Sequence, residues 1–454
     1  MLSNNRENEN ELISAGRLGC LFVFTRMKVC GLPLFTVLSV FSHSGSTAGF
    51  IIPESSVEGV ALSDAMVANS SLPGAFTYNY SSMIFADSDQ ASIDLIGVSL
   101  DTSVAPLSPN SETGKQNNQA SNALIPAFYI FQSLSSNYSW GLHFGVPFGL
   151  ESVWPEDTFT YFQDVDTATG AGGAVAGLHP AQSRLELVTL SPSLAKKINQ
   201  QFAVALGFDY YHLMDAELNS VANQVSGDGS ELGWNLSFQY HLNQWSFGAS
   251  YHSAIDMQIT GNANIAGVGS VGTKTSLGLP DRLQIGTGYQ FNEQWFVELD
   301  IERIGWSEYD QLQLTSTGGA IPATTVFSVN TNNWSDVTNV RLGMSYKIRN
   351  NTQLLFGAAF EEKAQGDDYF DAATADADRY MLSFGVLYQL TSEWILKAGY
   401  QYARIEERNI EGKDYLDQLV LTGGVNSDAN GTNAYNGQYE GYIQMLAVGI
   451  SRTL

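Results

Sequence analysis

Runs of about ten residues in which every second side chain is apolar recur along this chain of 454 residues. In 283–291, Leu, Ile, Thr, Tyr and Phe alternate with Gln and Gly, and 446–454 has Leu446, Val448 and Ile450 on one face. A period of two is typical of a β-strand with two different faces, and a tilted strand of this length crosses a bilayer. We count about fourteen runs, at 91–101, 123–133, 139–149, 183–194, 201–213, 231–241, 244–256, 281–290, 294–306, 337–347, 352–361, 380–390, 393–404 and 441–453.

The connections between these runs alternate in length. The six short ones are 133–139, 195–200, 241–244, 290–294, 347–352 and 389–393. Long ones lie between them, as at 150–182, 256–280, 307–336 and 405–440. Short turns at one end and long loops at the other are typical of outer-membrane barrels, whose short turns are periplasmic. The sequence therefore predicts an all-β protein, a transmembrane antiparallel β-barrel of about fourteen strands.

A soluble β-sandwich is the alternative, because its strands also alternate. The second face of the runs argues against it, since Glu298, Asp300 and Glu302 lie on one face of a single run. A sandwich core does not tolerate such a face, whereas a barrel lumen is polar. The composition agrees with a barrel: charged residues are only 15% of the chain and aromatic residues are 12%.

The amino terminus has the features of a secretory signal peptide. The apolar stretch 29–40 follows Arg26 and Lys28, and it leads to Ser46 and Ala48. These two small residues stand at the positions expected just before a cleavage site.

We therefore expect residues 1–48 to be removed, which leaves a mature chain that begins at Gly49; Met27 fits the true start of translation better than Met1. After Gly49 there is no apolar run of about 18 residues, the length of a spanning helix. An exported chain without such a helix is either soluble or a barrel.

Three segments carry sequence motifs in a specific order. Segment 146–150 reads Val-Pro-Phe-Gly-Leu, 277–314 contains Leu-Pro-Asp and then Gly-Trp-Ser, and 376–380 contains Asp-x-Asp-Arg-Tyr. Together they resemble the FadL family of outer-membrane transporters of long-chain fatty acids and hydrocarbons. The resemblance extends from Gly49 to Leu454.

This resemblance implies a fourteen-stranded barrel over 91–454, plugged by an amino-terminal hatch over 49–90. It implies uptake of hydrophobic molecules with lateral release into the membrane, and long-chain fatty acids are the first expectation. Neutral aromatic or aliphatic hydrocarbons are alternative ligands, and a hydrophilic porin is an alternative function. Residues 79–81 are Asn-Tyr-Ser where the family usually has Asn-Pro-Ala, and the chain ends in Leu454 where such barrels commonly end in Phe.

The resemblance also places a lateral opening at a kink in the third strand. Pro147 has no N–H to donate there, and Gly149 weakens a strand, so a break has a physical cause. The alternative is that Pro147 only ends the strand. Phe50 and Ile51 are then expected near the inner pocket, with Phe148 beside the kink.

The long connection 150–182 is rich in aromatic residues, among them Trp154 and Phe159. Exposed aromatic side chains on an outer loop favour capture of a hydrophobic ligand. The alternative is a loop that packs on itself. Burial of an alkyl chain contributes about 0.8 kcal/mol per CH₂, so a carrier needs an apolar pocket rather than a water-filled pore.

A fatty acid carboxylate would need a basic side chain inside the barrel. Alternation predicts that Arg184, Arg282, Arg341 and Lys397 face inward, and Arg184 and Arg341 are the candidate ligand-binding residues. Four acidic residues are also predicted to face inward: Glu186, Glu298, Asp300 and Glu302. Structural ion pairs are therefore the favoured role, which leaves room for an uncharged ligand.

Several other classes of function are excluded or disfavoured. A net charge of −25 repels phosphate backbones, which excludes a nucleic-acid partner. None of the six histidines lies in an H-E-x-x-H motif, and His143 has no identifiable serine partner, so we expect no enzyme, catalytic residue, metal or cofactor. We expect a monomer in the outer membrane, in contact with its lipid and lipopolysaccharide, with the amino terminus in the periplasm or the lumen.

Overall fold

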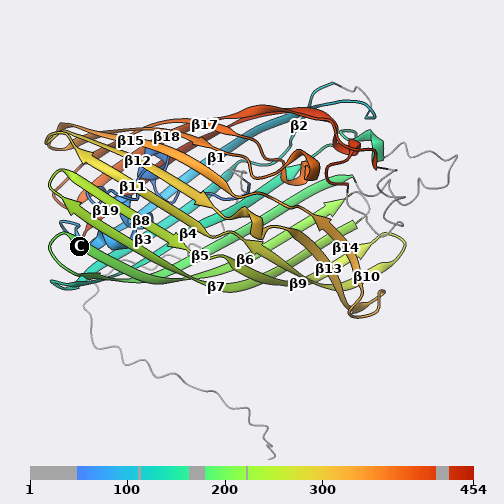
Figure 1. Ribbon diagram of the computed structural model, residues 1–454, viewed down its shortest axis with the longest axis horizontal. Coiled ribbons are helices and arrows are strands. Elements are labelled where there is room, and N and C mark those ends of the chain that lie inside the picture. The colour runs from blue at the N-terminus through green and yellow to red at the C-terminus, as the bar shows by residue number, and fades with distance from the viewer. Residues whose placement is uncertain (1–48, 111–113, 163–178, 221–222, 416–428) are drawn as a thin grey trace, which may run out of the picture. The chain divides into compact units, whose positions relative to one another are not determined.

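The alternating runs form one antiparallel sheet that closes on itself (Figure 1). β1 (Gln90–Pro106) pairs with β19 (Gly437–Thr453) on one side and with β3 (Ala123–Ser135) on the other, which closes the barrel. The computed structural model describes residues 49–110, 114–162, 179–220, 223–415 and 429–454.

The expected signal peptide, 1–48, and its cleavage site lie outside the described residues. In the part of the chain that is described, no helix is both long and apolar enough to span a membrane.

Within the described residues the barrel has fourteen wall strands, as the sequence predicted, and each contains one of the alternating runs. Ten are single strands: β1, β3, β4 (Tyr138–Val153), β5 (Pro180–Lys197), β6 (Phe202–Ser220), β7 (Asn223–Leu242), β16 (Thr352–Glu361), β17 (Arg379–Gln389), β18 (Trp394–Ile410) and β19. Four are built from two consecutive strands: β8 (Trp245–His252) with β9 (Ile255–Ile265), β10 (Gly269–Leu279) with β11 (Arg282–Gln290), β12 (Trp295–Ile304) with β13 (Gln311–Gly319), and β14 (Val326–Thr331) with β15 (Val337–Arg349). β2 (Gln116–Asn117) adds a two-residue pairing to β1.

The six short connections predicted from the sequence are the tight turns at one end of the barrel, which also holds the carboxyl terminus (Figure 1). Two predicted long loops are wrong. Residues 256–280 and 307–336 are largely strand, as β9, β10, β13 and β14. The outward side chains of β9, such as Gln258, Thr260 and Asn262, are polar and exposed. These strands continue past the apolar part of the wall, so they lack the apolar outward face by which the other strands are recognised.

The middle of the wall turns apolar side chains outward. Leu206 and Phe208 on β6, and Leu382 and Phe384 on β17, are all more than half exposed. Buried polar and charged residues alternate with them and face the lumen. This inversion of a soluble protein's pattern is typical of a wall that faces lipid.

Residues 49–89, which we call the amino-terminal segment, are packed inside the wall. They contain α1 (Val57–Leu62), η1 (Pro73–Thr77) and η2 (Tyr80–Ile84). α1 begins after Ser56, whose hydroxyl accepts a hydrogen bond from the Gly59 N–H, and it ends at Ser63 in the left-handed conformation. The remaining short 3₁₀ turns lie in connections: η3 (Thr160–Phe162), η4 (Trp306–Glu308), η5 (Asp367–Tyr369), η6 (Ala372–Thr374) and η7 (Asn433–Tyr435).

Inward-facing glycines on the wall let this segment approach the strands closely. At Gly248 an added Cβ would lie 1.8 Å from the carbonyl oxygen of Val67, and at Gly357 it would lie 2.2 Å from the backbone of Leu62. The same close approach is found on six further wall strands, at Gly141, Gly286, Gly343, Gly385, Gly399 and Gly449. Glycine is needed there because any side chain would occupy the space of the segment.

Candidate functional site

The barrel wall is interrupted between β3 and β4. Their pairing begins at the turn and stops at Phe128 opposite Phe144, although both strands continue. Just beyond this point β4 contains a β-bulge. Gly145 pairs with Thr189 of β5 and Phe148 pairs with Leu187, so this stretch of β4 is one residue longer than the stretch of β5 that it faces. Pro147 lies in this bulge and has no N–H to donate to a neighbouring strand.

The start of the amino-terminal segment occupies this break. The Ile52 N–H donates to the carbonyl oxygen of Pro147 at 2.9 Å, and the Gly149 N–H donates to that of Phe50 at 2.9 Å. Ile51 and Phe148 are therefore opposed as in an antiparallel sheet. The structure thus brings together all five residues that the sequence analysis assigned to the kink and the inner pocket.

Aromatic side chains surround Phe50 on the lumen side of the break. Its ring centroid lies 4.7 Å from that of Trp306, 5.3 Å from Tyr309 and 5.8 Å from Trp334. Trp306 and Tyr309 belong to the motif segment 277–314, but the sequence analysis gave them no role. Trp334 carried no sequence signal, because it lies in a connection whose position in space depends on the closed barrel.

Asp376, the first acidic residue of the Asp-x-Asp-Arg motif, anchors the start of the amino-terminal segment. Its Oδ1 accepts from the Gly49 N–H at 3.0 Å and from Nη2 of Arg379 at 3.0 Å. Its Oδ2 accepts from the Ala364 N–H at 2.7 Å. The carboxylate therefore joins residues more than 300 positions apart.

Among the cavities on the loop side of this cluster, one of about 50 Å³ is lined by Arg379 and Arg408, which are paired with Asp376 and Asp367. Two others, the inner and the outer cavity, are larger. The inner cavity, of about 100 Å³, is lined by apolar side chains from β5, β6, β9, β10 and β13, including Leu185, Leu218, Ile259, Leu277 and Leu314. The outer cavity, of about 250 Å³, lies at the loop ends of the strands. The two share five lining residues: Leu218, Val225, Leu314, Asn330 and Asp371. Tyr309 lines the inner cavity, which brings that cavity next to the aromatic cluster around Phe50.

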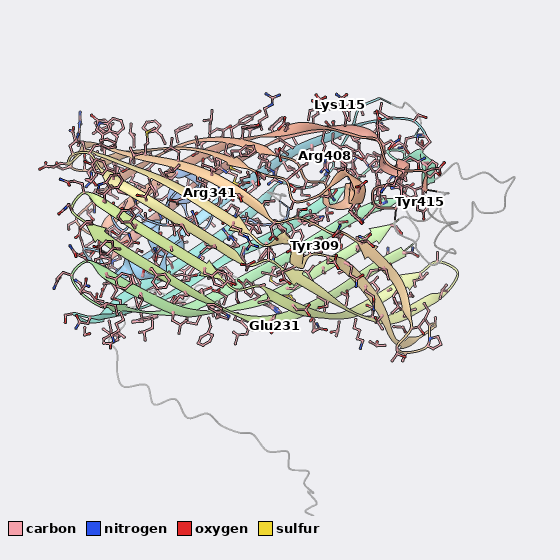
Figure 2. The ribbon with its side chains drawn as sticks, in the orientation of Figure 1. Lys115, Glu231, Tyr309, Arg341, Arg408 and Tyr415 are labelled. Carbon is pink, nitrogen blue, oxygen red and sulfur yellow. The ribbon has the colours of Figure 1, made fainter. Side chains whose placement is uncertain are left out.

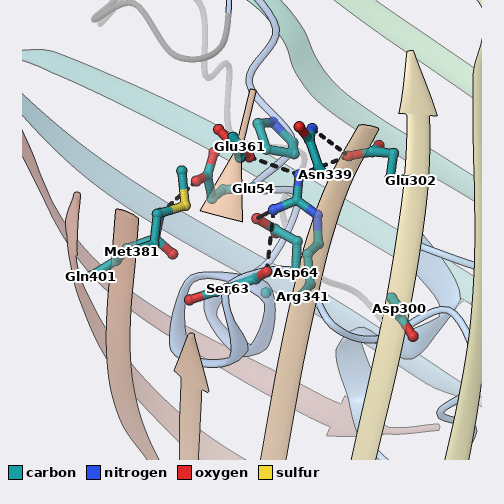
Figure 3. A network of polar contacts seen from close by, with 12 residues as sticks. Glu54, Ser63, Asp64, Asp300, Glu302, Asn339, Arg341, Glu361, Met381 and Gln401 are labelled. Carbon is teal, nitrogen blue, oxygen red and sulfur yellow. Dashed lines mark hydrogen bonds and ion pairs between the residues drawn. The ribbon is translucent and has the colours of Figure 1, made fainter. Parts of the chain in front are cut away.

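Arg341 faces the lumen, as predicted, but it lines neither the inner nor the outer cavity. Figure 2 shows it apart from Tyr309, which lines the inner cavity. Its guanidinium lies 2.7 Å from Glu302, 2.7 Å from Glu361 and 3.6 Å from Asp64 (Figure 3). Its side chain is 1% exposed, so no room remains for a ligand head group. Arg282 and Lys397 are paired in the same way, as the sequence analysis favoured.

Two carboxyl groups of the amino-terminal segment are affected by this network. Burial, with the nearby charges of Asp64 and Glu361, raises the pKa of Glu54 to about 8. Burial raises the pKa of Asp64 to about 6, although Arg341 and a hydrogen bond from Tyr78 oppose the shift. The end of the lumen near the turns therefore holds carboxyl groups in excess of what its cations neutralise.

Arg184 does not face the lumen, contrary to the alternation assigned from the sequence. Leu185 and Leu187 are buried against the lumen, whereas Leu190, on the same face of β5 as Arg184, is 40% exposed. Arg184 and Glu186 thus lie on the outer face and contact each other, and Arg184 also lies 3.7 Å from Asp215. A charged outward face is tolerated here because the strand has passed the apolar part of the wall.

Trp154 and Phe159 are not exposed on an outer loop, contrary to the reading in which they capture ligand. Their side chains are 4% and 0% exposed, and Trp154 donates a hydrogen bond from Nε1 to the carbonyl oxygen of Ala372 at 2.9 Å. They pack with Phe370 and Tyr435 from other connections and with Tyr439 of β19. Trp154 and Phe159 also pack on each other, with ring centroids 5.8 Å apart, so the connection packs on itself, as in the alternative, and on other parts of the chain as well.

Asn79 lies at the position of the family's Asn-Pro-Ala element, and its side chain makes several hydrogen bonds. Its Nδ2 donates to the carbonyl oxygens of Val67 and Phe238 at 2.7 and 2.8 Å and to the side chain of Gln239 at 2.9 Å. Its Oδ1 accepts from the hydroxyl of Ser81 at 2.6 Å. One buried side chain therefore holds the turn of the segment against β7.

Comparison with known proteins shows which proteins share this sequence pattern and this fold. Residues 38–454 match the family model described as "Outer membrane protein transport protein (OMPP1/FadL/TodX)". The chain is 21% identical over 426 residues to the long-chain fatty acid transport protein of Escherichia coli K12. This alignment covers 81% of the chain and 90% of that relative. It is 23% identical over 416 residues to the 47 kDa outer membrane protein of Pasteurella multocida, covering 82% and 90%.

Two solved structures have the same fold. A Pseudomonas aeruginosa FadL homologue aligns with a TM-score of 0.72 at 15% identity, covering 89% of this chain and all of that one. The Pseudomonas putida toluene transporter TodX aligns with a TM-score of 0.63 at 14% identity, covering 90% of this chain and all of that one.

Proposed function

The chain belongs to the OMPP1/FadL/TodX family of outer membrane transport proteins, and we propose that its own ligands are uncharged hydrophobic molecules that leave the barrel sideways. Members of this family transport hydrophobic substrates across the outer membrane and are not enzymes.

The observation that carries the choice of ligand is the state of the basic residues. Among the described residues that line the inner and outer cavities, the one basic residue is Arg184. Its guanidinium is turned to Glu186 and Asp215, while Glu217 and Asp371 also border the inner cavity. A buried carboxylate is costly without a cation, so this cavity favours a neutral ligand.

The proposed route follows the apolar surfaces. A ligand enters the outer cavity, moves to the inner cavity through the wall that they share, and reaches the aromatic cluster at Phe50. Displacement of residues 50–52 from Pro147 and Gly149 then opens the break between β3 and β4 toward lipid. Two backbone hydrogen bonds join these residues to β4, and each contributes about 0.5–1.5 kcal/mol. The packing of Phe50 on Phe148 and Trp306 opposes the step as well.

In this proposal residues 1–48 are a signal peptide, and residues 49–90 act as a hatch that blocks passage straight through the barrel. The hatch argues against the hydrophilic porin, because the segment fills the space between glycines on opposite sides of the wall. Only residues 50–52 of the proposed hatch move when ligand leaves sideways, so the ion pairs of Glu58 and Asp64 need not break.

Long-chain fatty acids are the second candidate. The similarity to the long-chain fatty acid transport protein of E. coli favours them, and Arg184 lies beside the inner cavity. A fatty acid carboxylate would have to replace Glu186 as the partner of this guanidinium.

The test measures uptake of radiolabelled toluene and oleate by cells that express the protein, beside cells with the empty vector. The proposal predicts uptake of toluene that exceeds the control, with little or no gain for oleate. A gain for oleate alone would support fatty acid transport and contradict the uncharged ligand. Uptake of small sugars with neither hydrophobic compound would support the porin.

A further inference from the structure

The break between β3 and β4 is closed again at its loop end. The last ladder pair is Phe128 opposite Phe144, and nine residues beyond each of them lie Gln119 and Val153. The Gln119 N–H donates to the carbonyl oxygen of Val153 at 2.8 Å, so the two chain segments meet a second time. The break is therefore a window with two closed ends, and we call it the lateral window.

Both edges of the lateral window are held from behind. Residues 123–127 of β3 have no partner on β4, but each of them pairs with β1. Residues 148–150 of β4 pair with β5. Five residues of extended strand measure about 17 Å. How far the two edges can part over this length depends on what holds the ends of the window together.

Asn118 holds the loop end with its side chain. Its Oδ1 accepts from the Val153 N–H of β4 at 3.0 Å and from the Ala120 N–H at 2.9 Å. Its own backbone N–H donates to the carbonyl oxygen of Thr102, on β1, at 2.9 Å. One residue therefore joins β1 to β4 across the place where β3 has not yet begun.

A second side chain closes the same end from β4. Oε2 of Glu151 accepts from the Ser121 N–H at 2.8 Å, and Glu151 is 3% exposed. We call Asn118, Gln119, Ser121, Glu151 and Val153 the clasp.

The two ends of the lateral window differ in strength. A ladder of seven residue pairs closes the turn end. Among the described residues, the clasp has one backbone-to-backbone hydrogen bond across the window, and its other bonds depend on the side chains of Asn118 and Glu151. A single substitution can therefore weaken the loop end, whereas the turn end is secured by the backbone of both strands.

We propose that the clasp limits the size of the molecules that leave through the lateral window, with Asn118 as its positioning residue. Edges joined at both ends part little between them, so a single aromatic ring passes and a wide fused-ring hydrocarbon is held back. When the clasp opens, the edges part from the turn end like a hinge. The inference rests on the proposed function and adds to it a limit on ligand size.

The test compares uptake of radiolabelled toluene and pyrene by cells that express the protein, after subtraction of uptake by empty-vector cells. Asn118→Ala removes the acceptor for the Val153 N–H. It is expected to raise the ratio of pyrene uptake to toluene uptake about two- to tenfold, the equivalent of one hydrogen bond. Asn118→Asp keeps an acceptor oxygen at this position, so its ratio is expected to stay near wild type.

Asn199→Ala is the matched control. Oδ1 of Asn199 also accepts two backbone N–H groups, from Gln201 at 2.8 Å and from Phe202 at 2.9 Å, but it lies in a short turn between β5 and β6. The same substitution there removes the same kind of hydrogen bond at the other end of the barrel. The ratio is expected to be unchanged.

Hydrogen–deuterium exchange at Val153, in purified protein in detergent, follows the clasp without any ligand. Asn118→Ala is expected to speed this exchange about two- to tenfold, and Asn199→Ala is expected to leave it unchanged.

The outcomes separate this inference from the proposed function. If Asn118→Ala speeds exchange at Val153 but leaves the uptake ratio unchanged, the clasp does not limit size and the inference is overturned, while lateral release stands. If exchange is unchanged too, or if Asn199→Ala raises the ratio equally, Asn118 has no special role and the inference also fails. If wild-type cells take up toluene no faster than empty-vector cells, the proposed function fails, and the size limit fails with it.

Discussion

The half of the lumen near the short turns and the half near the long loops differ in how they hold charge. Near the turns, Lys397 and Arg341 are fully buried, and each contacts at least two carboxylates. Near the loops, the inner and outer cavities have mainly apolar walls, and the one basic residue that borders them among the described residues, Arg184, is paired with Glu186 and Asp215. One half is therefore held by interactions that are costly to break, whereas the other has apolar space for the ligand that we propose.

The largest expected effect comes from Lys397→Met. Nζ of Lys397 lies 2.9 Å from Glu58 of α1 and 2.8 Å from Asp94 of β1, and all three side chains are buried. Removal of the cation leaves two buried carboxylates facing each other, and breaking a buried pair costs about 3–5 kcal/mol. The thermal midpoint in detergent, followed by circular dichroism, is expected to fall sharply.

Lys115→Met is the matched control, because Lys115 pairs with Glu440 at 2.8 Å in an exposed position. Such surface pairs contribute little to stability, so its thermal midpoint is expected to stay near wild type. Equal effects of the two variants would contradict the contrast between the two kinds of ion pair.

Asp376→Asn is expected to loosen the start of the amino-terminal segment. The neutral amide no longer offers a charged acceptor to Gly49 and leaves Arg379 with Glu361, 3.8 Å away, as its remaining ion-pair partner among the described residues. A hydrogen bond to a charged group contributes about 1.5–3 kcal/mol, so exchange of the Ile52 amide hydrogen is expected to speed up about tenfold or more. Unchanged hydrogen–deuterium exchange at residues 50–53 would show that Asp376 does not hold the segment.

A third prediction concerns pH. The pKa of Glu54 is raised from 4.5 to about 8 by burial and by Asp64 and Glu361, while Gln401 donates to its Oε1 at 2.7 Å. The folded protein therefore binds more protons than the unfolded chain between these pH values, and stability contributed by protonated Glu54 is lost as pH rises through about 8.

Glu54→Gln mimics the protonated form, so it is expected to be more stable than wild type at pH 9 and similar at pH 5. Thermal midpoints of the two proteins across this range check the prediction. Parallel curves would mean that Glu54 is already ionised in the folded protein at low pH.

The smallest effect is expected for Arg184→Gln. Because its guanidinium lies on the outer face and contacts Glu186, the substitution is expected to leave uptake of toluene unchanged. A selective loss of oleate uptake would place Arg184 in contact with a ligand carboxylate, and the charge contrast between the two halves would no longer hold.

The sequence was sufficient to predict the number of strands, the short turns, and which charged residues of β11, β12, β15 and β18 face the lumen. Each of these depends on a period of two within a single strand. Arg184 was misplaced because a charged side chain was assumed to face inward, although β5 has left the apolar part of the wall at that point. The loop strands β9, β10, β13 and β14 were missed for the same reason.

The site was predictable only in part. Pro147 and Gly149 carry a local signal, since proline and glycine weaken any strand, and Phe50 and Ile51 followed from the family resemblance. Among the aromatic partners of Phe50, Trp306 and Tyr309 lie in a motif that gave no role, and Trp334 carries no signal. Their roles come from side chains that meet only when fourteen strands close, and no pattern along the chain encodes those distances.

The central claim is that ligand leaves through the break between β3 and β4, and a reversible disulfide tests it most directly. Ile51 and Phe148 form a non-hydrogen-bonded antiparallel pair, in which the Cα atoms are about 4.5 Å apart, a separation that a disulfide spans. The double variant Ile51→Cys, Phe148→Cys is oxidised to fix the amino-terminal segment in the break, and uptake of toluene is measured before and after reduction, beside each single cysteine variant. We predict that uptake is lost in the oxidised protein and returns on reduction, whereas equal uptake in both states would contradict lateral release.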